Sequence, residues 1–237
     1  MLLIALAAAA APVVIASKAG HVEFHYGWSA EAAAVPALDR RFRLEAGKLL
    51  REYRADVAAD RAMRRKARSE IADIIYFFSR EWETAGQSPR LLSLEAGTGT
   101  YTGGAHANSG TASLLWNRRA NRELSMDDLL QRRGWWNGAI RQPACVLLDR
   151  ERSERRQEPI VRGEWPNHCP ELKELTLTLE DRDRDQRFDH VRVTADPYSA
   201  GPYAEGEYVV RLPLTAAMLA RVKPEYRPSF EPQPPVQ

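Results

Sequence analysis

The sequence predicts an α+β fold in which antiparallel sheets pack against helices and form two associated subdomains. Three observations support this prediction. Short stretches of alternating apolar and polar residues, typical of strands, recur along the chain. Residues 38–57 instead carry apolar side chains at helical spacing. The chain has 237 residues, which is enough for one large domain or two small ones, each with its own core.

The composition is that of an ordinary globular protein, with 44% hydrophobic and 28% charged residues. The formal net charge is only +2, and the arginines are spread among acidic residues rather than gathered in one basic stripe. Such a stripe is the usual sign of a nucleic-acid-binding protein, so the sequence argues against that class.

An apolar segment opens the chain and ends at Lys18. It is too short for an ordinary membrane span, and its small residues suit signal-peptidase cleavage after Ala11 or Ser17. We therefore predict a signal peptide at residues 1–17, a periplasmic or secreted protein, and no stable transmembrane span after cleavage. An uncleaved short anchor is the alternative. No Lys or Arg precedes the apolar run, which leaves the true start open.

The chain has two cysteines, Cys145 and Cys169, and they do not form a CxxC motif. In an exported protein such a pair predicts one disulfide. The bond would close a loop of 23 intervening residues. A loop of that size contributes on the order of 3 kcal/mol to stability. Two free buried thiols are the alternative.

The segment after the predicted signal reads as a strand followed by a long helix. Residues 22–26 alternate between polar and apolar side chains, as a strand does. Pro36 suits the first turn of a helix, which we expect to run to about Arg65. The basic cluster at residues 64–66 is expected in solvent at the end of this helix, where cations suit the helix dipole.

A β-hairpin is expected next. Residues 74–84 predict one strand, residues 85–89 a turn, and the segment from Arg90 the returning strand. The aromatic residues of the first strand are assigned to the core, with a ligand platform as the alternative: Tyr76, Phe77, Phe78 and Trp82.

The returning strand leads into the densest cluster of unusual residues, Tyr-Thr-Gly-Gly-Ala-His-Ala-Asn at residues 101–108, called the glycine motif below. Gly103 and Gly104 bring no side chain, so they indicate a positive φ or a close approach to the backbone. The sequence that follows is typical of a strand, which excludes a phosphate-binding loop, because such a loop opens a helix. His106 is either a hydrogen-bonded residue that pins a bend or a ligand-binding or acid–base group.

Further elements follow the glycine motif. Residues 111–116 predict a strand of another hairpin, and Ser125 with the acids after it predicts a helix start. The segment up to about Arg156 is mostly helical, with interruptions at Gly134 and Pro143.

The charged run at residues 150–158 is expected to be a solvated face. Residues 175–179 and 191–193 alternate and predict two strands. Between these strands, aspartates at alternate positions imitate a calcium-binding loop, although Gln186 and Arg192 replace its usual glycine and glutamate. An exposed turn is the alternative to this weak calcium site, whose ligands would be Asp181, Asp183, Asp185 and Asp189.

A second motif lies at residues 196–206, Asp-Pro-Tyr-Ser-Ala-Gly-Pro-Tyr-Ala-Glu-Gly, called the Gly-Pro-Tyr loop below. Its prolines exclude a central strand, so an ordered loop is expected, anchored by Tyr198 and Tyr203. A strand at residues 207–212 and a short helix at 215–222 complete the predicted elements.

Together the two motifs resemble the signature of a bacterial extracytoplasmic family, domain of unknown function 3298, with its 4163-type N-terminal neighbour. The resemblance spans about residues 22–223. It implies a 4163-like subdomain at residues 18–118 and a 3298-like subdomain at 119–223, followed by a Pro-rich flexible tail at 224–237. The same domain pair is similar to the extracellular part of lysozyme-sensing anti-sigma factors and to the accessory region of some peptidoglycan deacetylases.

The resemblance implies a non-catalytic envelope module that binds or senses a protein partner or an envelope glycan. Lysozyme and peptidoglycan are the first candidates, although a nearly neutral binder gains no steering toward a strongly basic lysozyme. The alternatives are a periplasmic hydrolase, with His106 and either Glu205 or Asp196 as acid–base groups, and a purely structural envelope protein. No cofactor is expected. The candidate ligand-binding residues are Tyr101, Gly103, Gly104, His106, Asn108, Tyr198, Tyr203 and Glu205.

Overall fold

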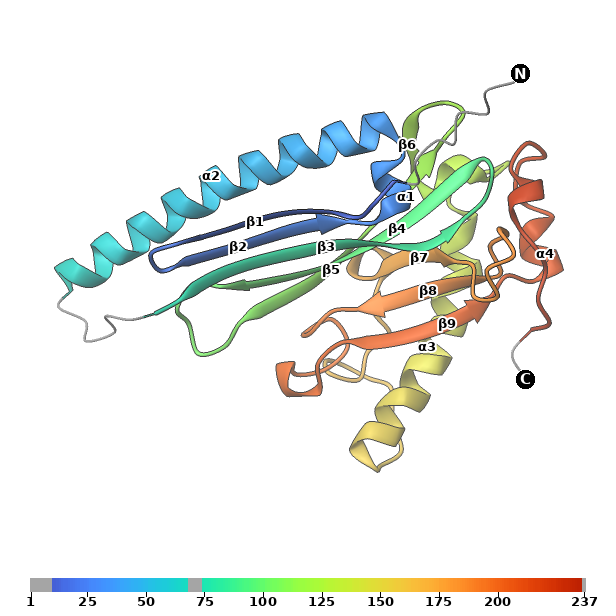
Figure 1. Cartoon of the computed structure of the whole chain (residues 1–237). Helices are drawn as coiled ribbons and strands as arrows, with labels where there is room; N and C mark the ends of the chain where they lie inside the picture. The colour runs from blue at the N-terminus through green and yellow to red at the C-terminus, as the bar shows by residue number, and fades with distance from the viewer. Residues whose placement is uncertain (1–9, 68–73, 236–237) are drawn as a thin grey trace, which may run out of the picture. The chain divides into compact units, whose positions relative to one another are not determined.

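The computed structural model describes residues 10–67 and 74–235, and it has the expected α+β fold (Figure 1). Six strands form one sheet in the order β1-β2-β3-β4-β5-β6, and three form another in the order β7-β8-β9. The strands are β1 (Val13–Ala19), β2 (Val22–Trp28), β3 (Tyr76–Gln87), β4 (Leu91–Tyr101), β5 (Asn108–Asn117), β6 (Arg122–Leu124), β7 (Thr176–Glu180), β8 (His190–Ala195) and β9 (Tyr208–Pro213). The α-helices are α1 (Ala30–Ala33), α2 (Pro36–Lys66), α3 (Trp135–Arg156) and α4 (Ala216–Leu219).

The chain divides into two compact units, each described separately below. Unit 1 comprises residues 1–83 and 97–108, and unit 2 comprises residues 84–96 and 109–237. Strands β3 and β4 therefore contribute residues to both units, so the units alternate along the sequence. The sequence predicts one boundary instead, between residues 118 and 119.

Helix α2 organises unit 1. It begins at Pro36, as predicted, because proline lacks the N–H that the first turn leaves unpaired. The connection through α2 joins β2 to β3, which pair in parallel, and parallel neighbours need such a long crossover. Figure 1 shows α2 running along the sheet. The core between them is largely aromatic, and its buried members include Phe24, Tyr26, Trp28, Phe42, Tyr53, Tyr76, Phe78 and Trp82.

One member of the predicted aromatic core lies elsewhere. Tyr76, Phe78 and Trp82 are buried, whereas Phe77 is only half-buried. Successive side chains of a strand point to opposite faces of the sheet, so Phe77 points away from the core face that its neighbours occupy. Assigning all four residues to the core was therefore wrong for Phe77.

The predicted signal segment overlaps the first strand. Residues 1–9 lie outside the described part of the chain, but β1 pairs antiparallel with β2, from Val13 opposite Trp28 to Ala19 opposite Val22. Of the two predicted cleavage positions, Ala11 leaves β1 intact and Ser17 removes most of it. Within the described residues, we find no helix with both the length and the apolar character that a membrane crossing requires.

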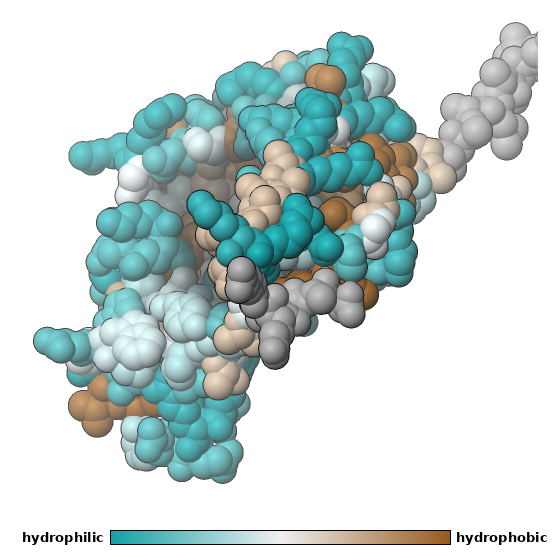
Figure 2. Space-filling model, turned by 90° about the vertical axis from the view of Figure 1, so that its left-hand side faces the viewer, coloured by the Kyte–Doolittle hydropathy of each residue, from teal (hydrophilic) through white to brown (hydrophobic). Residues whose placement is uncertain are grey.

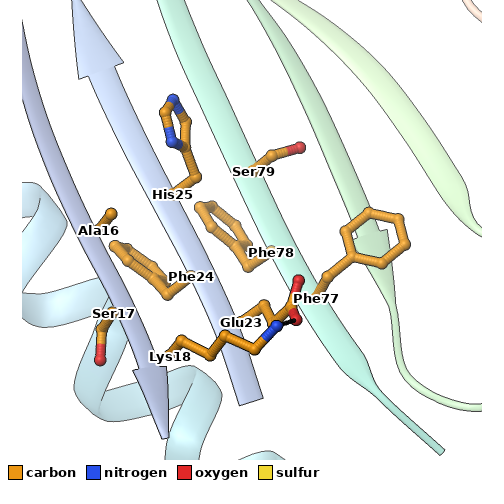
Figure 3. A pocket seen from close by; sticks show the side chains of 9 residues that line it. All are labelled: Ala16, Ser17, Lys18, Glu23, Phe24, His25, Phe77, Phe78 and Ser79. Carbon is orange, nitrogen blue, oxygen red and sulfur yellow. Dashed lines mark ion pairs between the residues drawn. The ribbon is translucent and has the colours of Figure 1, made fainter. Parts of the chain in front are cut away.

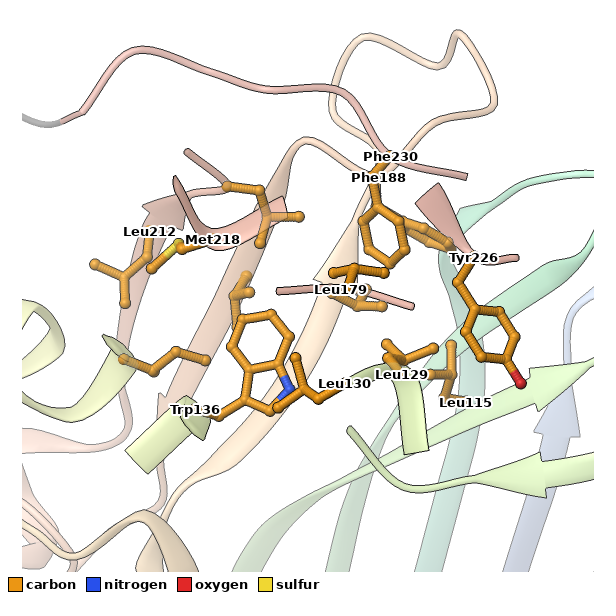
Figure 4. Close-up of a cluster of buried hydrophobic side chains, with 14 of the residues drawn as sticks. Leu115, Leu129, Leu130, Trp136, Leu179, Phe188, Leu212, Met218, Tyr226 and Phe230 are labelled. Carbon is orange, nitrogen blue, oxygen red and sulfur yellow. The ribbon is translucent and has the colours of Figure 1, made fainter. Parts of the chain in front are cut away.

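Unit 2 has its own core, formed by the three-stranded sheet, α3 and the segments around α4 (Figure 4). Helix α3 begins after Gly134, which has φ +77° and therefore marks a break, as predicted. Pro143, by contrast, lies inside a continuous helix, so the predicted interruption there was wrong. Ser125 forms the predicted capping box with Asp128, although the helix it caps is a short 3-10 helix, residues 126–129.

The expected flexible tail needs a correction. Tyr226 and Phe230 are both 5% exposed, and the Phe230 ring lies 5.5 Å from that of Phe188 (Figure 4). Phe188 and Phe230 also form an isolated β-bridge. Prolines at residues 224 and 228 suggested a loose tail, but two aromatic side chains provide enough apolar burial to hold this segment against unit 2.

The predicted disulfide is present and joins α3 to the segment that follows it. The Cα atoms of Cys145 and Cys169 are 5.5 Å apart. The bond closes the loop that carries residues 157–168, part of which lies beside the Gly-Pro-Tyr loop described below.

Candidate functional site

The glycine motif forms the turn between β4 and β5 in unit 1. Gly103 has φ +87°, and an added Cβ would lie 2.9 Å from Arg64 Nη2. Both reasons that the sequence offered for a glycine therefore apply at this position. Gly104 has neither constraint, since an added Cβ would meet only the His106 carbonyl oxygen, at 3.9 Å. The Tyr101 hydroxyl donates to the Gly104 carbonyl, at 3.0 Å, and closes the turn.

Two side chains of α2 hold the glycine motif. The Tyr53 hydroxyl donates to the Tyr101 carbonyl, at 2.8 Å, and Arg64 Nη2 donates to the Gly103 carbonyl, at 2.9 Å. Arg64 also donates to Asp60, whose pKa this hydrogen bond lowers, with a smaller contribution from the Tyr76 hydroxyl. The expectation that the basic end of this helix is merely solvated was therefore wrong for Arg64.

The two polar candidates of the glycine motif are both exposed, His106 in the turn and Asn108 at the start of β5. His106 Nδ1 lies 2.9 Å from the Ala107 carbonyl oxygen, which supports the interpretation of a histidine that pins a bend. That contact leaves open the ligand-binding interpretation of His106.

The Gly-Pro-Tyr loop lies in unit 2, between β8 and β9. The rings of Tyr198 and Tyr203 are 5.8 Å apart, so the structure brings these two candidates together. Tyr198 has φ +74°, an uncommon conformation for a residue with a side chain. Its carbonyl accepts a hydrogen bond from the Trp165 indole, at 3.3 Å. Tyr198 on the loop and Trp165 in the segment after α3 are 55% and 54% exposed, so the two segments present aromatic surface to solvent.

The ion pair between Arg156 and Glu205 holds the loop against α3. Glu205 accepts two hydrogen bonds from Arg156, at 2.7 and 2.8 Å, and one from the Tyr208 hydroxyl, at 2.6 Å. A Cβ on Gly201 would collide with the Glu205 carboxylate, which explains the glycine of the motif. The Arg156 guanidinium lowers the pKa of Glu205, and the Tyr208 hydroxyl adds to this effect. Glu205 therefore stays ionised at neutral pH.

A second arginine of α3 ties three segments together. Arg152 is fully buried and donates to the Ala200 carbonyl in the loop, at 2.7 Å, and to the His168 carbonyl, at 3.1 Å. It also pairs with Asp149 at 3.1 Å, and burial lowers the pKa of Arg152. The prediction that residues 150–158 form a solvated face was wrong here, since Arg152 and Arg156 point into unit 2.

The surface around the loop combines apolar and cationic side chains. Val161 is 79% exposed, and its carbonyl accepts a hydrogen bond from the Asn167 side chain, which in turn accepts one from Arg156. Arg155 lies over the Tyr208 ring at 4.1 Å, and Arg162 pairs with Asp149. Figure 2 shows one face of the molecule, on which most side chains are hydrophilic and hydrophobic ones form smaller groups between them. Large exposed apolar residues therefore stand out where they occur.

The acid–base candidates of the hydrolase alternative have structural partners. Glu205 is held as a carboxylate by Arg156, which makes it a poor general acid. Asp196 accepts the Thr111 backbone N–H through Oδ2, at 3.0 Å. These contacts account for Glu205 and for one oxygen of Asp196 as parts of the loop's scaffold, whereas Asp196 Oδ1 is buried without a hydrogen-bond partner among the described residues.

The aspartate-rich turn lies between β7 and β8. Carboxylate oxygens of Asp181, Asp183 and Asp185 lie within 4.8 Å of one another. Backbone N–H groups of the turn already donate to Asp181, and the Arg187 side chain pairs with Asp185. Burial raises the pKa of Asp181, and the backbone hydrogen bonds oppose this shift. The turn could hold a hard cation, and its internal bonds explain its shape equally well.

Sequence reasoning missed the residues that shape the Gly-Pro-Tyr loop, namely Arg152, Arg156, Trp165 and Tyr208. One signal was present. Arg152 and Arg156 are four residues apart and share a helix face with the buried Leu148, so one face of the charged run packs against the rest of unit 2. Nothing local indicated which loop this face would meet.

Comparisons with known proteins bear on the fold. No protein-family model and no curated protein matches the sequence. A solved structure of a member of the DUF3298 family from Bacteroides fragilis is similar, with a TM-score of 0.57 and 17% identity, over 93% of this chain and 97% of that one. A DUF3298 family protein from Pseudomonas aeruginosa has a TM-score of 0.50 and 19% identity, over 94% and 98%. The chain therefore has the fold of solved members of the family, domain of unknown function 3298, that its two motifs resemble.

Proposed function

We propose that the chain is an exported, non-catalytic binding module of the bacterial cell envelope, and that the surface around its Gly-Pro-Tyr loop binds peptidoglycan. The observation that carries this proposal is the exposure of two aromatic side chains beside each other. Tyr198 is on the loop that the buried Arg152 ties to α3, and Trp165, from the segment after α3, donates to the Tyr198 carbonyl. Exposing aromatic side chains to water is unfavourable. Because the loop is already held rigidly, ligand binding would not have to order it, so less conformational entropy is lost on binding.

The chemistry of this surface favours peptidoglycan. Aromatic rings offer broad apolar area to sugar rings, while Arg155, which donates to the backbone carbonyls of Glu205 and Glu207 rather than to an acid, suits the carboxylates of stem peptides. A strongly basic lysozyme is less complementary to a surface flanked by arginines. The disulfide between Cys145 and Cys169 supports export, because such bonds persist in oxidising compartments.

The test is a calorimetric titration of the oxidised chain, beginning at Pro12 so that β1 is kept, with a soluble disaccharide–tetrapeptide fragment. We expect saturable binding at micromolar affinity or tighter, with no release of reducing ends from the fragment. Trp165→Ala and Tyr198→Ala should each weaken binding about ten-fold, since aromatic anchors dominate such surfaces. Val146→Ala, which removes an exposed apolar side chain of α3, is the matched control and should bind normally.

Two outcomes would overturn the proposal. One is the absence of binding by a folded wild-type chain, and the other is binding that neither aromatic substitution changes. A parallel titration with lysozyme separates the remaining alternative. Binding to lysozyme that Trp165→Ala abolishes, together with no binding to the fragment, would assign this surface to a protein partner instead.

A further inference from the structure

In unit 1, the sheet has an open face on the side opposite to α2. Residues on this face follow from the strand registers, since Ala16 lies opposite His25, which neighbours Ser79, and Lys18 lies opposite Glu23, which neighbours Phe77. These six side chains border a shallow cavity of about 440 Å³ (Figure 3). Its volume is in the range of small-ligand sites.

Glycines keep this face flat, and most of them have a packing reason. A Cβ on Gly27 would overlap the Glu81 carboxylate, and one on Gly99 would lie 2.9 Å from Ser79 Oγ and 3.4 Å from the Phe77 ring. Gly97, two residues before Gly99 in β4, is different. An added Cβ would meet no heavy atom within 4 Å, and its φ is not in the left-handed region.

Gly97 therefore has no reason in the packing of this structure. Glycine inside a strand weakens the strand, and it is expected where a ligand or another backbone approaches closely. The bare backbone at Gly97 lies in the same strand and on the same face as Tyr101, whose ring stacks on Phe77 at 6.2 Å and 25°. Without a side chain at Gly97, this part of the sheet is a flat area bordered by the nearly parallel rings of Phe77 and Tyr101.

The polar groups on this face are paired and exposed. His25 Nε2 lies 2.7 Å from Glu81, and the two side chains are 45% and 42% exposed. Lys18 and Glu23 form a second pair at the edge of the cavity (Figure 3). Because each acid has a cationic or imidazole partner, the face suits an uncharged ligand with many hydroxyl groups rather than an ion.

From these observations we infer that the open sheet face of unit 1 is a binding platform for a neutral saccharide chain. Phe77 and Tyr101 offer their rings to the apolar face of a sugar, Gly97 leaves room for it, and His25, Glu81 and Ser79 supply hydrogen-bonding groups. This inference goes beyond the proposed function, because it concerns another unit and a ligand without carboxylates.

The experiment uses two neutral tetrasaccharides, chitotetraose and cellotetraose, titrated into the same oxidised chain. The informative variant is Gly97→Leu, which adds a side chain over the platform at a position where an added Cβ meets no heavy atom of the described residues within 4 Å. We expect binding of at least one tetrasaccharide, weakened more than ten-fold in Gly97→Leu and about ten-fold in Phe77→Ala. Circular dichroism and the unfolding midpoint show that the Gly97→Leu chain is folded.

Two controls separate this inference from the proposed function. Leu44→Ala removes an exposed apolar side chain from α2, on the other side of the sheet, and should bind the tetrasaccharides normally. Tyr198→Ala should keep the binding that Gly97→Leu removes, because Tyr198 belongs to unit 2 and borders no part of the platform. No binding by the folded wild-type chain, or binding unchanged in both Gly97→Leu and Phe77→Ala, would overturn the inference.

Discussion

The glycine motif of unit 1 and the Gly-Pro-Tyr loop of unit 2 are both turns that contain glycine, yet different forces hold them. The glycine motif is held by two hydrogen bonds from α2 to backbone carbonyls, and its tip is exposed. The Gly-Pro-Tyr loop is held by the buried Arg152 and by the ion pair of Arg156 with Glu205. Buried charges make the second region far more sensitive to the loss of one partner.

The two regions also differ in how much of each is explained by packing. At Gly103 a positive φ and the approach of Arg64 account for the residue, so its presence needs no ligand. At the Gly-Pro-Tyr loop, Gly201 and Glu205 are explained by packing, but the exposure of Trp165 and Tyr198 is not. Unexplained exposure is the better guide to a binding surface than an unusual motif.

The largest effect is expected for Arg152→Ala. It leaves Asp149 without its buried partner and two carbonyls without a donor, so the free energy of unfolding should fall by about 4 kcal/mol. Urea denaturation measures this change. Arg150→Ala, at an exposed position of the same helix, should change the free energy by less than about 0.5 kcal/mol. Equal effects of the two variants would remove the contrast between the two regions.

The next effect concerns the disulfide. Replacing Cys145 and Cys169 by serine should lower the free energy of unfolding by about 3 kcal/mol, because the loop between them gains freedom in the unfolded chain. Hydrogen exchange should show faster exchange in residues 157–171 and little change in the glycine motif. Faster exchange at the glycine motif as well would show that the two regions are not independent.

Gly103→Ala should cost about 1–2 kcal/mol, since alanine is strained at φ +87° and its Cβ crowds Arg64. Thermal unfolding with calorimetric analysis measures the loss. Gly104→Ala is the matched control and should lie within about 0.5 kcal/mol of the wild type. A larger loss at Gly104 than at Gly103 would contradict the structural explanation of the motif.

The smallest effect is the acid sensitivity of the Gly-Pro-Tyr loop. The pKa of Glu205 is lowered in the folded chain, so its pairing with Arg156 stabilises the loop at pH values above the unfolded pKa. This contribution is lost as the pH falls through the lowered pKa. Glu205→Gln should therefore be less stable than the wild type at pH 7, and the difference should shrink below about pH 4. A constant difference across this range would contradict the assignment.

Local patterns in the sequence were enough to predict much of the secondary structure. Pro36 marks the start of α2, Ser125 caps its short helix with Asp128, and alternation predicts β7 and β8. The disulfide followed from there being only two cysteines in a chain expected to be exported. Each of these features depends on residues near one another in the chain or on a choice with few alternatives.

Tertiary structure alone decided which side of each element became functional surface. Alternation placed Phe77 in a strand but did not say which face α2 would cover. The run at residues 150–158 had helical character, yet Arg152 is buried only because the carbonyls of His168 and Ala200 lie beside it. The sequence by itself determined elements and turns through local backbone preferences. The binding surfaces depended on contacts between residues far apart in the chain, which no local pattern encodes.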